Sequence, residues 1–242
     1  MFTENQLSEI KKLISPEKKV VIITHYNPDG DAIGSALGLK HFLNNMGVEP
    51  TVLAPNDFPK FLKWMPDAKK VVIAEYKRKT AGEAIYKADI IFCLDFNAHN
   101  RIGILGDWLM KSWAKKILID HHQQPEDFDY VYSDVTIPAT CQMVYHFIEA
   151  LGREDLVDQN VAECLYTGIM TDTGGFRFRS TSATTHRIVA NLIEKGANPA
   201  MITSNTWDTN SVSRLHLLSL ILGRIELVKE GKVAILYLKR EE

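Results

Sequence analysis

The feature that most constrains the fold is an alternation of short apolar runs with segments of helical character in the first half of the chain. In these runs the apolar residues are continuous and do not alternate with polar ones, within residues 19–24, 51–54, 71–74, 89–95, 116–120 and 130–133. A continuous apolar run is typical of a parallel strand covered by helices on both faces. The segments at residues 34–46, 81–87 and 107–114 favour helices. The sequence therefore predicts an α/β fold, a doubly wound and mainly parallel sheet.

The second half of the chain changes character and favours helices. Four segments have helical patterns, at residues 139–151, 159–171, 183–195 and 211–228. Gly152 and Gly196 are typical of helix ends, and Pro199 is typical of a helix start. The last segment, residues 231–242, is predicted to form one strand after a turn, with no partner strand nearby in the sequence.

Composition excludes several classes of protein and of partner. The chain has 242 residues and a formal net charge of −2, so it has no overall basic field to attract a nucleic acid. An anionic substrate must therefore be bound by a local site. The longest apolar run, residues 217–223, is interrupted by Ser219 and is far shorter than the roughly 20 residues that span a membrane. The three cysteines lie in apolar contexts, which indicates reduced thiols and a cytoplasmic protein.

Acidic and imidazole side chains follow the first predicted strand, in the segment HYNPDGDAIGS. This segment holds His25, Asp29 and Asp31 within seven residues, at the end of a strand where functional groups gather in open α/β sheets. The proline and glycine between them predict a non-helical loop. Asp29 and Asp31 on extended backbone would point to different sides, which suits two metal ions better than one. A helix is predicted to begin only at Gly34 and Ser35.

Acidic or imidazole side chains also lie at the ends of two further predicted strands and of one predicted helix. Asp95 follows the fourth strand, Asp120, His121 and His122 close the fifth, and Asp172 closes a helix. Carboxylates and imidazoles without thiolates suit Mn²⁺ or Mg²⁺ better than structural zinc. Two such ions about 3.5–4 Å apart form the usual clamp for phosphoester displacement. Positively charged or imidazole groups are then available for substrate phosphate: Arg101, His122, Arg177 and Arg179.

Other interpretations of the same residues are open on sequence alone. The groups around His25 form a polar turn in one alternative, and the paired histidines form a solvated loop in another. Asp172 fits an Asx turn before the two glycines that follow it. Residues 176–179 alternate phenylalanine with arginine, which also fits an amphipathic strand with exposed arginines. The leucines between residues 215 and 222 fit a core, a domain joint or a dimer face.

Four motifs in order make the chain resemble the DHH phosphoesterase superfamily. They are HYNPDGDAIGS, CLDFN with the following RIG, LIDHH, and GIMTDTGGFRF, and the resemblance runs from about residue 15 to about residue 225. Within the superfamily the chain is most similar to the nano-RNase branch of oligoribonucleases and 3′-phosphoadenosine-5′-phosphate (pAp) phosphatases. Other members of the superfamily are RecJ-type exonucleases, cyclic-di-AMP phosphodiesterases, exopolyphosphatases and family II pyrophosphatases.

The resemblance implies a role for each candidate residue. One Mn²⁺ would be held by His25, Asp29 and Asp95. The other would be held by Asp31, Asp95, His121 and Asp172. Asp95 would bridge the ions, together with the water that acts as nucleophile. Asp120 would orient His121 through a hydrogen bond, and His122 would face the scissile phosphate. Arg101 and Arg177 would contact substrate phosphate.

The resemblance also implies a division of the chain. Residues 1–210 would form the catalytic domain and residues 211–228 a connecting helix. Residues 229–242 would be the first strand of a smaller substrate-binding domain, whose glycine-rich motif has no match here.

The function expected from residues and resemblance together is hydrolysis of short single-stranded oligoribonucleotides or pAp by a water that two divalent ions activate. Mn²⁺ is the expected ion, with Mg²⁺ or another divalent ion as alternatives. Pyrophosphate, polyphosphate and cyclic dinucleotides are alternative substrates within the superfamily. A catalytically silent nucleotide sensor is the non-enzymatic alternative. No membrane partner is expected, and a homodimer is left open.

Overall fold

The computed structural model describes residues 2–239, and its central element is a parallel sheet. Six strands pair in parallel in the order β3-β2-β1-β4-β5-β6. Their bounds are β1 Val20–Ile23, β2 Thr51–Ala54, β3 Val72–Ile73, β4 Ile90–Leu94, β5 Lys115–Asp120 and β6 Tyr130–Ser133. This order reverses direction between β1 and β4, which defines the topological switch point of a doubly wound sheet. The predicted fold class is confirmed.

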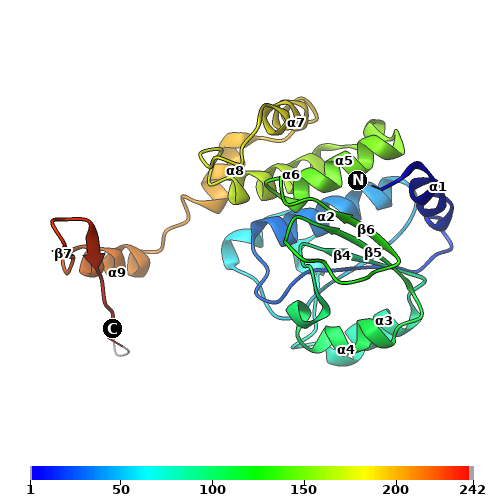
Figure 1. Ribbon diagram of the computed structural model, residues 1–242, viewed down its shortest axis with the longest axis horizontal. Helices are drawn as coiled ribbons and strands as arrows, with labels where there is room; N and C mark the ends of the chain where they lie inside the picture. Colours follow the sequence, from blue (N-terminus) through cyan, green and yellow to red (C-terminus); the bar gives the residue numbers. More distant parts are fainter. Residues whose placement is uncertain (1, 240–242) are drawn as a thin grey trace. The chain divides into compact units, whose positions relative to one another are not determined.

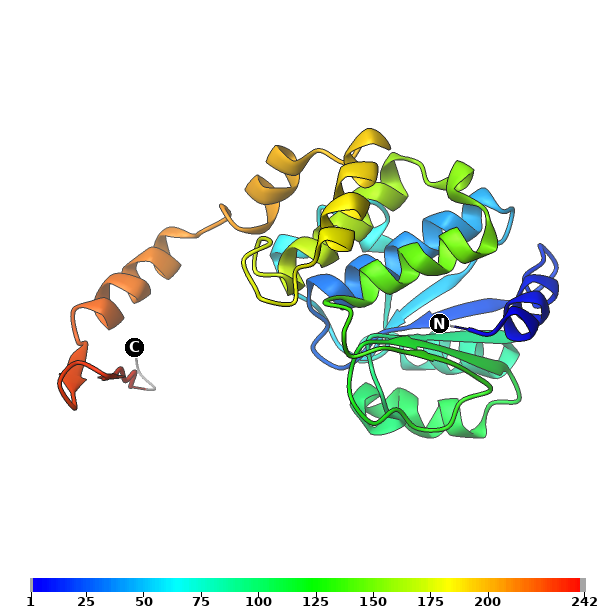
Figure 2. The same ribbon diagram turned by 45° about the horizontal axis from the view of Figure 1, so that its top comes forward.

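Helices cover both faces of the sheet, as Figures 1 and 2 show. One face carries α2 (Gly30–Asn45), α5 (Thr140–Leu151) and α6 (Gln159–Asp172). The other carries α3 (Arg78–Lys87) and α4 (Ile104–Lys111). The remaining helices of this part are α1 (Glu4–Leu13), α7 (Ala183–Glu194) and the short helices Lys60–Leu62, Ala68–Lys70, His99–Ile102 and Glu154–Leu156.

The side chains of the central strands explain why the apolar runs are continuous. In β1, Val20 and Ile22 point into the core under α2, whereas Val21 and Ile23 point into the core under α3 and α4. All four are at most 2% exposed. Because successive residues of a strand face opposite sides, a strand between two helical layers needs apolar residues at every position.

The start of α2 differs from the prediction. The helix begins at Gly30 and not at Gly34, so Asp31 lies in its first turn and not on extended backbone. Asp29 is the N-cap, and its carboxylate accepts hydrogen bonds of 3.0 Å from the backbone N–H groups of Asp31 and Ala32. These bonds satisfy donors that have no partner within the helix, which allows the helix to begin directly after the strand loop.

The end of the chain also differs from the prediction. The chain divides into two compact units after Ile202, and α8 (Pro199–Thr206) includes this position. The second unit contains α9 (Val212–Leu222) and two strands, β7 (Glu226–Val228) and β8 (Val233–Ile235). The strands pair antiparallel, so the prediction of a single strand without a nearby partner is wrong. The hairpin forms because residues 229–231 all adopt positive φ, which reverses the chain.

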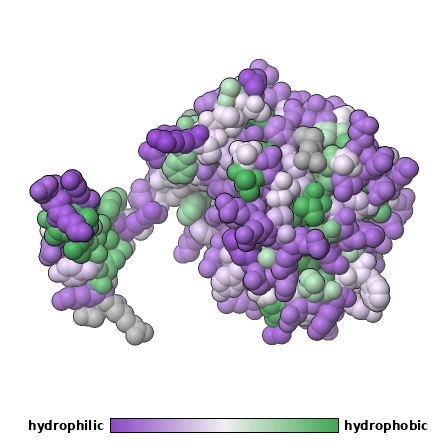
Figure 3. All heavy atoms as spheres, viewed as in Figure 1, coloured by the Kyte–Doolittle hydropathy of each residue, from purple (hydrophilic) through white to green (hydrophobic). Residues whose placement is uncertain are grey.

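The helix predicted for residues 211–228 ends early, at Leu222, where Gly223 is the C-cap. The leucines of α9 are exposed in the described chain, so they do not form a core within this unit. Figure 3 shows hydrophobic side chains on the surface of this part of the chain. The predicted boundaries at residues 210 and 228 stay a prediction.

Two further observations concern membrane-spanning helices and the cysteines. In the described range, residues 2–239, no helix is both long enough and apolar enough to cross a membrane. Cys93, Cys141 and Cys164 are buried and unpaired.

Candidate active site

The first group of candidate ligands lies at the switch point of the sheet. His25 follows β1, Asp29 caps α2, and Asp95 follows β4, the neighbouring strand. The Nε2 atom of His25 is 3.8 Å from Oδ1 of Asp29 and 3.5 Å from Oδ2 of Asp95. The Nδ1 atom of His25 is 2.8 Å from the carbonyl oxygen of Tyr26, which leaves Nε2 to face the two carboxylates.

The second group comes from three different elements. Asp31 lies in the first turn of α2, His121 follows β5, and Asp172 is the last residue of α6. The Nε2 atom of His121 is 3.9 Å from Oδ2 of Asp31 and 3.6 Å from Oδ2 of Asp172. It is also 3.4 Å from Oδ1 of Asp95.

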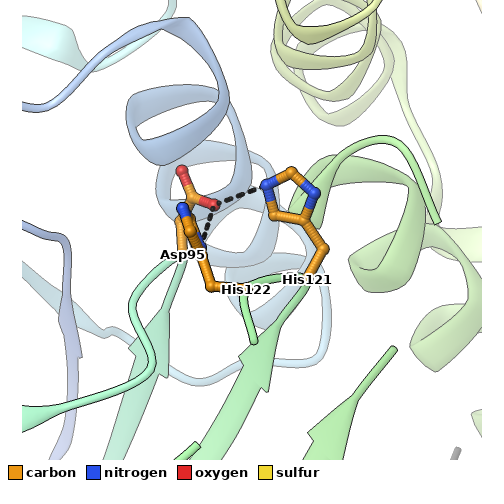
Figure 4. Close-up of side chains that lie close together, drawn as sticks. All are labelled: Asp95, His121 and His122. Atoms are coloured by element: carbon orange, nitrogen blue, oxygen red, sulfur yellow. Dashed lines mark ion pairs between the residues drawn. The ribbon is translucent and has the colours of Figure 1, made fainter. Parts of the chain in front are cut away.

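Asp95 is therefore shared between the two groups. Its Oδ2 faces His25, and its Oδ1 faces His121, so each group has one oxygen of the same carboxylate. Figure 4 shows the Asp95 carboxylate with one oxygen facing both His121 and His122. Asp95 also has a φ of 64°, a left-handed conformation that is uncommon for a residue other than glycine. Strain of this kind is concentrated at functional sites.

Close packing of α6 against α2 brings Asp172 to the site. A Cβ atom on Gly168 of α6 would overlap the sulfur of Cys141 and lie 2.9 Å from Oδ1 of Asp31. A Cβ atom on Gly30 would overlap the side chain of Thr171. Glycine at both positions allows the helices to approach closely enough for both carboxylates to reach one place.

The hydrogen bond predicted between Asp120 and His121 is not present, and Asp120 binds the other histidine. The Nδ1 atom of His122 is 2.7 Å from Oδ1 of Asp120, and the N–H of His122 donates to Oδ2 at 3.1 Å. The chain turns directly after β5, which returns His122 over the preceding carboxylate. His121 instead places Nδ1 3.3 Å from the carbonyl oxygen of Ile137.

His122 also lies near Asp95, with Nδ1 3.9 Å from Oδ1. Asp95, His121 and His122 can therefore be grouped as a third candidate ligand set. The short contact with Asp120 occupies the Nδ1 atom of His122, because a carboxylate can only accept that hydrogen bond. The atom of His122 that lies near Asp95 is therefore already bonded, whereas Nε2 of His121 faces three carboxylates as a candidate ligand atom.

The two predicted arginines do not contact the cluster in the described residues. Arg101 is exposed in the helix His99–Ile102, and its carbonyl oxygen accepts from the N–H of Tyr26 at 2.7 Å. Arg177 is exposed, and its Nε donates to the carbonyl oxygen of Gly174 at 2.6 Å. Residues 176–179 form turns, with Phe176 at a φ of 66°, and not the alternative amphipathic strand.

Sequence reasoning missed the residues that hold the site loops together. Asn97, after β4, donates through Nδ2 to the carbonyl oxygen of Gln123 at 2.8 Å. His99 places Nδ1 2.8 Å from Oε2 of Glu126. These contacts join the loops that follow Asp95 and His122. No local pattern marks such pairs, because their members are 26 and 27 residues apart.

Thr140, the first residue of α5, was also missed. Its hydroxyl donates to Oδ1 of Asp95 at 2.8 Å, and its backbone N–H donates to Oδ2 of Asp31 at 2.5 Å. Its position at the start of a predicted helix was the only available signal.

The electrostatics of the site fit a bound cation. Within residues 2–239, the ion pairs of these carboxylates are all with histidines. Burial, followed by the charge of Asp95, raises the pKa of Asp31 well above its usual range. Burial and the charges of Asp31 and Asp95 raise the pKa of Asp172 to about 9. Burial lowers the pKa of His25, but Asp29 and Asp95 outweigh it and raise the pKa to about 10.

The geometry and the donor set fit divalent ions of the Mg²⁺ or Mn²⁺ type. An octahedral ion with bonds of about 2.1 Å places its ligand atoms about 3.0 to 4.2 Å apart. The separations of 3.4–3.9 Å found in both groups lie in this range. The donors are carboxylate oxygens and imidazole nitrogens, without a thiolate.

Comparison with known proteins agrees with this architecture. An exopolyphosphatase-related protein from Bacteroides fragilis has a TM-score of 0.96 and 38% identity, covering 100% of this chain and 72% of that one. The bifunctional oligoribonuclease and PAP phosphatase NrnA of Thermus thermophilus is 34% identical over 81% of this chain, but the match spans only 56% of that relative. The exonuclease RecJ bound to manganese shares the fold, with a TM-score of 0.50 and 14% identity over 91% of this chain and 52% of that one.

Residues 19–169 match the DHH family N-terminal domain, and this range includes His25, Asp29, Asp31, Asp95, His121 and His122. The match covers well over half of the chain. The chain belongs to the DHH family of phosphoesterases.

Proposed function

We propose that this chain is a metal-dependent phosphoesterase that hydrolyses short oligoribonucleotides, pAp or both. The observation that carries the proposal is the shared position of Asp95, with one carboxylate oxygen toward His25 and the other toward His121. A single carboxylate between two ligand groups is the arrangement that holds a pair of divalent ions.

Each of the two ligand groups would hold one ion. His25, Asp29 and Asp95 would hold one ion, and Asp31, Asp95, His121 and Asp172 the other. Mn²⁺ is the proposed ion, which is also the ion named in the RecJ structure. When bound, two such ions neutralise phosphate charge and lower the pKa of water.

His122 would contact the scissile phosphate. Its side chain is 33% exposed, whereas that of Asp120 is fully buried, so the ring stands between a fixed carboxylate and solvent. The bond from Nδ1 to Asp120 fixes the tautomer and leaves Nε2 for the substrate. Arg101 is exposed in the short helix His99–Ile102, and its carbonyl oxygen accepts from the N–H of Tyr26, the residue after His25; it is proposed as a further phosphate contact. Arg177 is proposed for the same role from the loop after Asp172, where its Nε is anchored to Gly174.

Two observations support nucleotide substrates. The Thermus relative, named for oligoribonuclease and PAP phosphatase activities, is 34% identical. The net charge of −2 also favours small anions over long polymers, because long nucleic acids are attracted by extended basic surfaces.

Polyphosphate or pyrophosphate is the second candidate substrate class. It is favoured by the 38% identical Bacteroides protein, which is described as exopolyphosphatase-related. Both candidates use the same two ligand groups, so the choice between them is a choice of substrate and not of chemistry.

The test is a hydrolysis panel with Mn²⁺ that contains pAp, a diribonucleotide, a cyclic dinucleotide and pyrophosphate. We expect release of phosphate from pAp or of mononucleotide from the diribonucleotide. Asp95→Asn should be inactive, and Asp107→Asn, a change on the exposed side of α4, should retain full activity. Hydrolysis of pyrophosphate alone would favour the second candidate. No hydrolysis of any substrate, with Mn²⁺ still bound, would favour a silent sensor.

A further inference from the structure

Thr140 is completely buried between two of the candidate ligands. It is 0% exposed, as is Asp31, and Asp95 is 2% exposed. Its hydroxyl donates to Oδ1 of Asp95 at 2.8 Å, and its N–H donates to Oδ2 of Asp31. One residue therefore binds both the shared carboxylate and a ligand of the second group.

Asp31 takes the place of a helix cap for α5. The N-cap of α5 is Ala139, which has no side-chain acceptor. The N–H groups of Thr140 and Cys141 donate instead to the two oxygens of Asp31, and the bond from Cys141 is 2.8 Å long. These are among the donors that a helix cannot satisfy internally, and the positive end of the helix favours a negative charge. The Asp31 carboxylate is thereby fixed, with Oδ2 toward His121.

The Thr140 hydroxyl fixes the rotation of the Asp95 carboxylate. A carboxylate oxygen has two lone-pair sites. On Oδ1 of Asp95 one site accepts the Thr140 hydroxyl, and the other remains for the group that contains His121. With Oδ1 held in this way, Oδ2 is directed toward His25.

We propose that Thr140 is a positioning residue that assigns one oxygen of Asp95 to each metal group. This inference rests on the proposed function, because it requires that the two groups hold ions. Its hydroxyl acts directly on Oδ1, so its loss weakens the group of Asp31, His121 and Asp172 more than the group of His25 and Asp29. The backbone bonds to Asp31 come from N–H groups, so they remain when Thr140 is replaced by valine, alanine or serine.

The test measures Mn²⁺ affinity by calorimetric titration of the full chain after removal of metal. Thr140→Val keeps the shape and removes the hydroxyl, and Thr140→Ser keeps the hydroxyl. Thr140→Ala, which adds no new group, is an independent variant if valine impairs folding. Thr167→Val is the matched control, since Thr167 is also fully buried and its hydroxyl donates only to the carbonyl oxygen of Glu163. Circular dichroism confirms that each variant is folded.

We expect Thr140→Val and Thr140→Ala to weaken one of two binding phases by about 10–100-fold, the usual effect of removing a bond that orients a ligand. The Mn²⁺ affinity of the other phase should stay within roughly threefold of wild type, well below that effect. Thr140→Ser and Thr167→Val should keep the affinity of both phases within the same roughly threefold range.

Three results would overturn the inference. Wild-type affinity in a folded variant without the hydroxyl would show that the bond to Asp95 has no positioning role. Equal weakening by Thr140→Val and Thr140→Ser would indicate packing and not the hydrogen bond. Absence of Mn²⁺ binding by the wild-type chain would overturn the proposed function itself, and this inference with it.

Discussion

Asp95→Asn tests the shared carboxylate directly. The substitution preserves the shape of the side chain and removes its charge. Because Asp95 faces His25 through one oxygen and His121 through the other, the change reaches both groups at once. Asp29→Asn and Asp172→Asn each reach one group only, since Asp29 lies near His25 and Asp172 near His121.

The expected rise in Tm on adding Mn²⁺ follows from the number of ligand groups that can still hold an ion. At a free Mn²⁺ concentration 100 times its Kd, each bound ion adds about 2.7 kcal/mol to the free energy of unfolding. Two ions therefore add about 5 kcal/mol. For a domain of this size each kcal/mol raises Tm by about 2–4 °C, which gives a shift of roughly 10–20 °C. We expect the full shift in wild type, about half of it in Asp29→Asn and Asp172→Asn, and almost none in Asp95→Asn.

The assay is thermal unfolding followed by circular dichroism, with and without Mn²⁺. Asp107→Asn is the control for a lost surface carboxylate and should keep the full shift. If Asp95→Asn keeps half of the shift, as the single-group variants do, Asp95 belongs to one group and the reasoning is refuted.

Three further predictions concern single side chains. His122→Ala should keep the Mn²⁺-dependent rise in Tm but lower turnover about 10²–10⁴-fold, and loss of Mn²⁺ binding instead would mean that the two histidines exchange roles. Gly168→Ala should lower the free energy of unfolding by roughly 3 kcal/mol in urea titration, because its Cβ atom would overlap Cys141; an unchanged midpoint would contradict the close approach. Burial raises the pKa of Asp67, but Lys40 and Lys70 outweigh it and lower the pKa from 3.8 to about 2. The charge of Asp67 therefore adds about 2 kcal/mol to the free energy of unfolding above pH 4, and this contribution is lost as the pH falls toward 2. The difference in the free energy of unfolding between wild type and Asp67→Asn should therefore narrow over that interval.

The arrangement of the strands could be predicted because burial on both faces leaves a pattern in the sequence. The two central strands, β1 and β4, are apolar at every position, and each is followed by a polar residue where the chain leaves the sheet. Asp95 and His121 could be placed on the same edge for that reason alone, since parallel strands end on one side. The distances of 3.4–3.9 Å between the candidate ligands required the structure.

The details that escaped prediction depend on contacts between distant segments or on local capping. A capping bond by Asp29 starts α2 four residues before the expected position. Asp120 binds His122 because the backbone bends directly after β5, which residue spacing does not reveal. The bonds from Thr140 to Asp31 and Asp95 join residues 109 and 45 positions apart, and a threonine at the start of a helix has no pattern that distinguishes it from an ordinary one.

The same contacts explain how the folded chain accommodates two buried carboxylates. Asp31 and Asp95 are buried close together, and unpaired buried carboxylates destabilise a folded chain strongly. Asp31 is compensated by two backbone N–H groups of α5, and Asp95 by the Thr140 hydroxyl and two histidines. These donors are sufficient to hold the carboxylates in place, but all of the charged ones are imidazoles that can become neutral. A lysine or arginine in their position would stabilise the fold permanently and would also repel a cation. Within residues 2–239 the ion pairs of these carboxylates are all with histidines, an arrangement that suits the proposed pair of divalent ions.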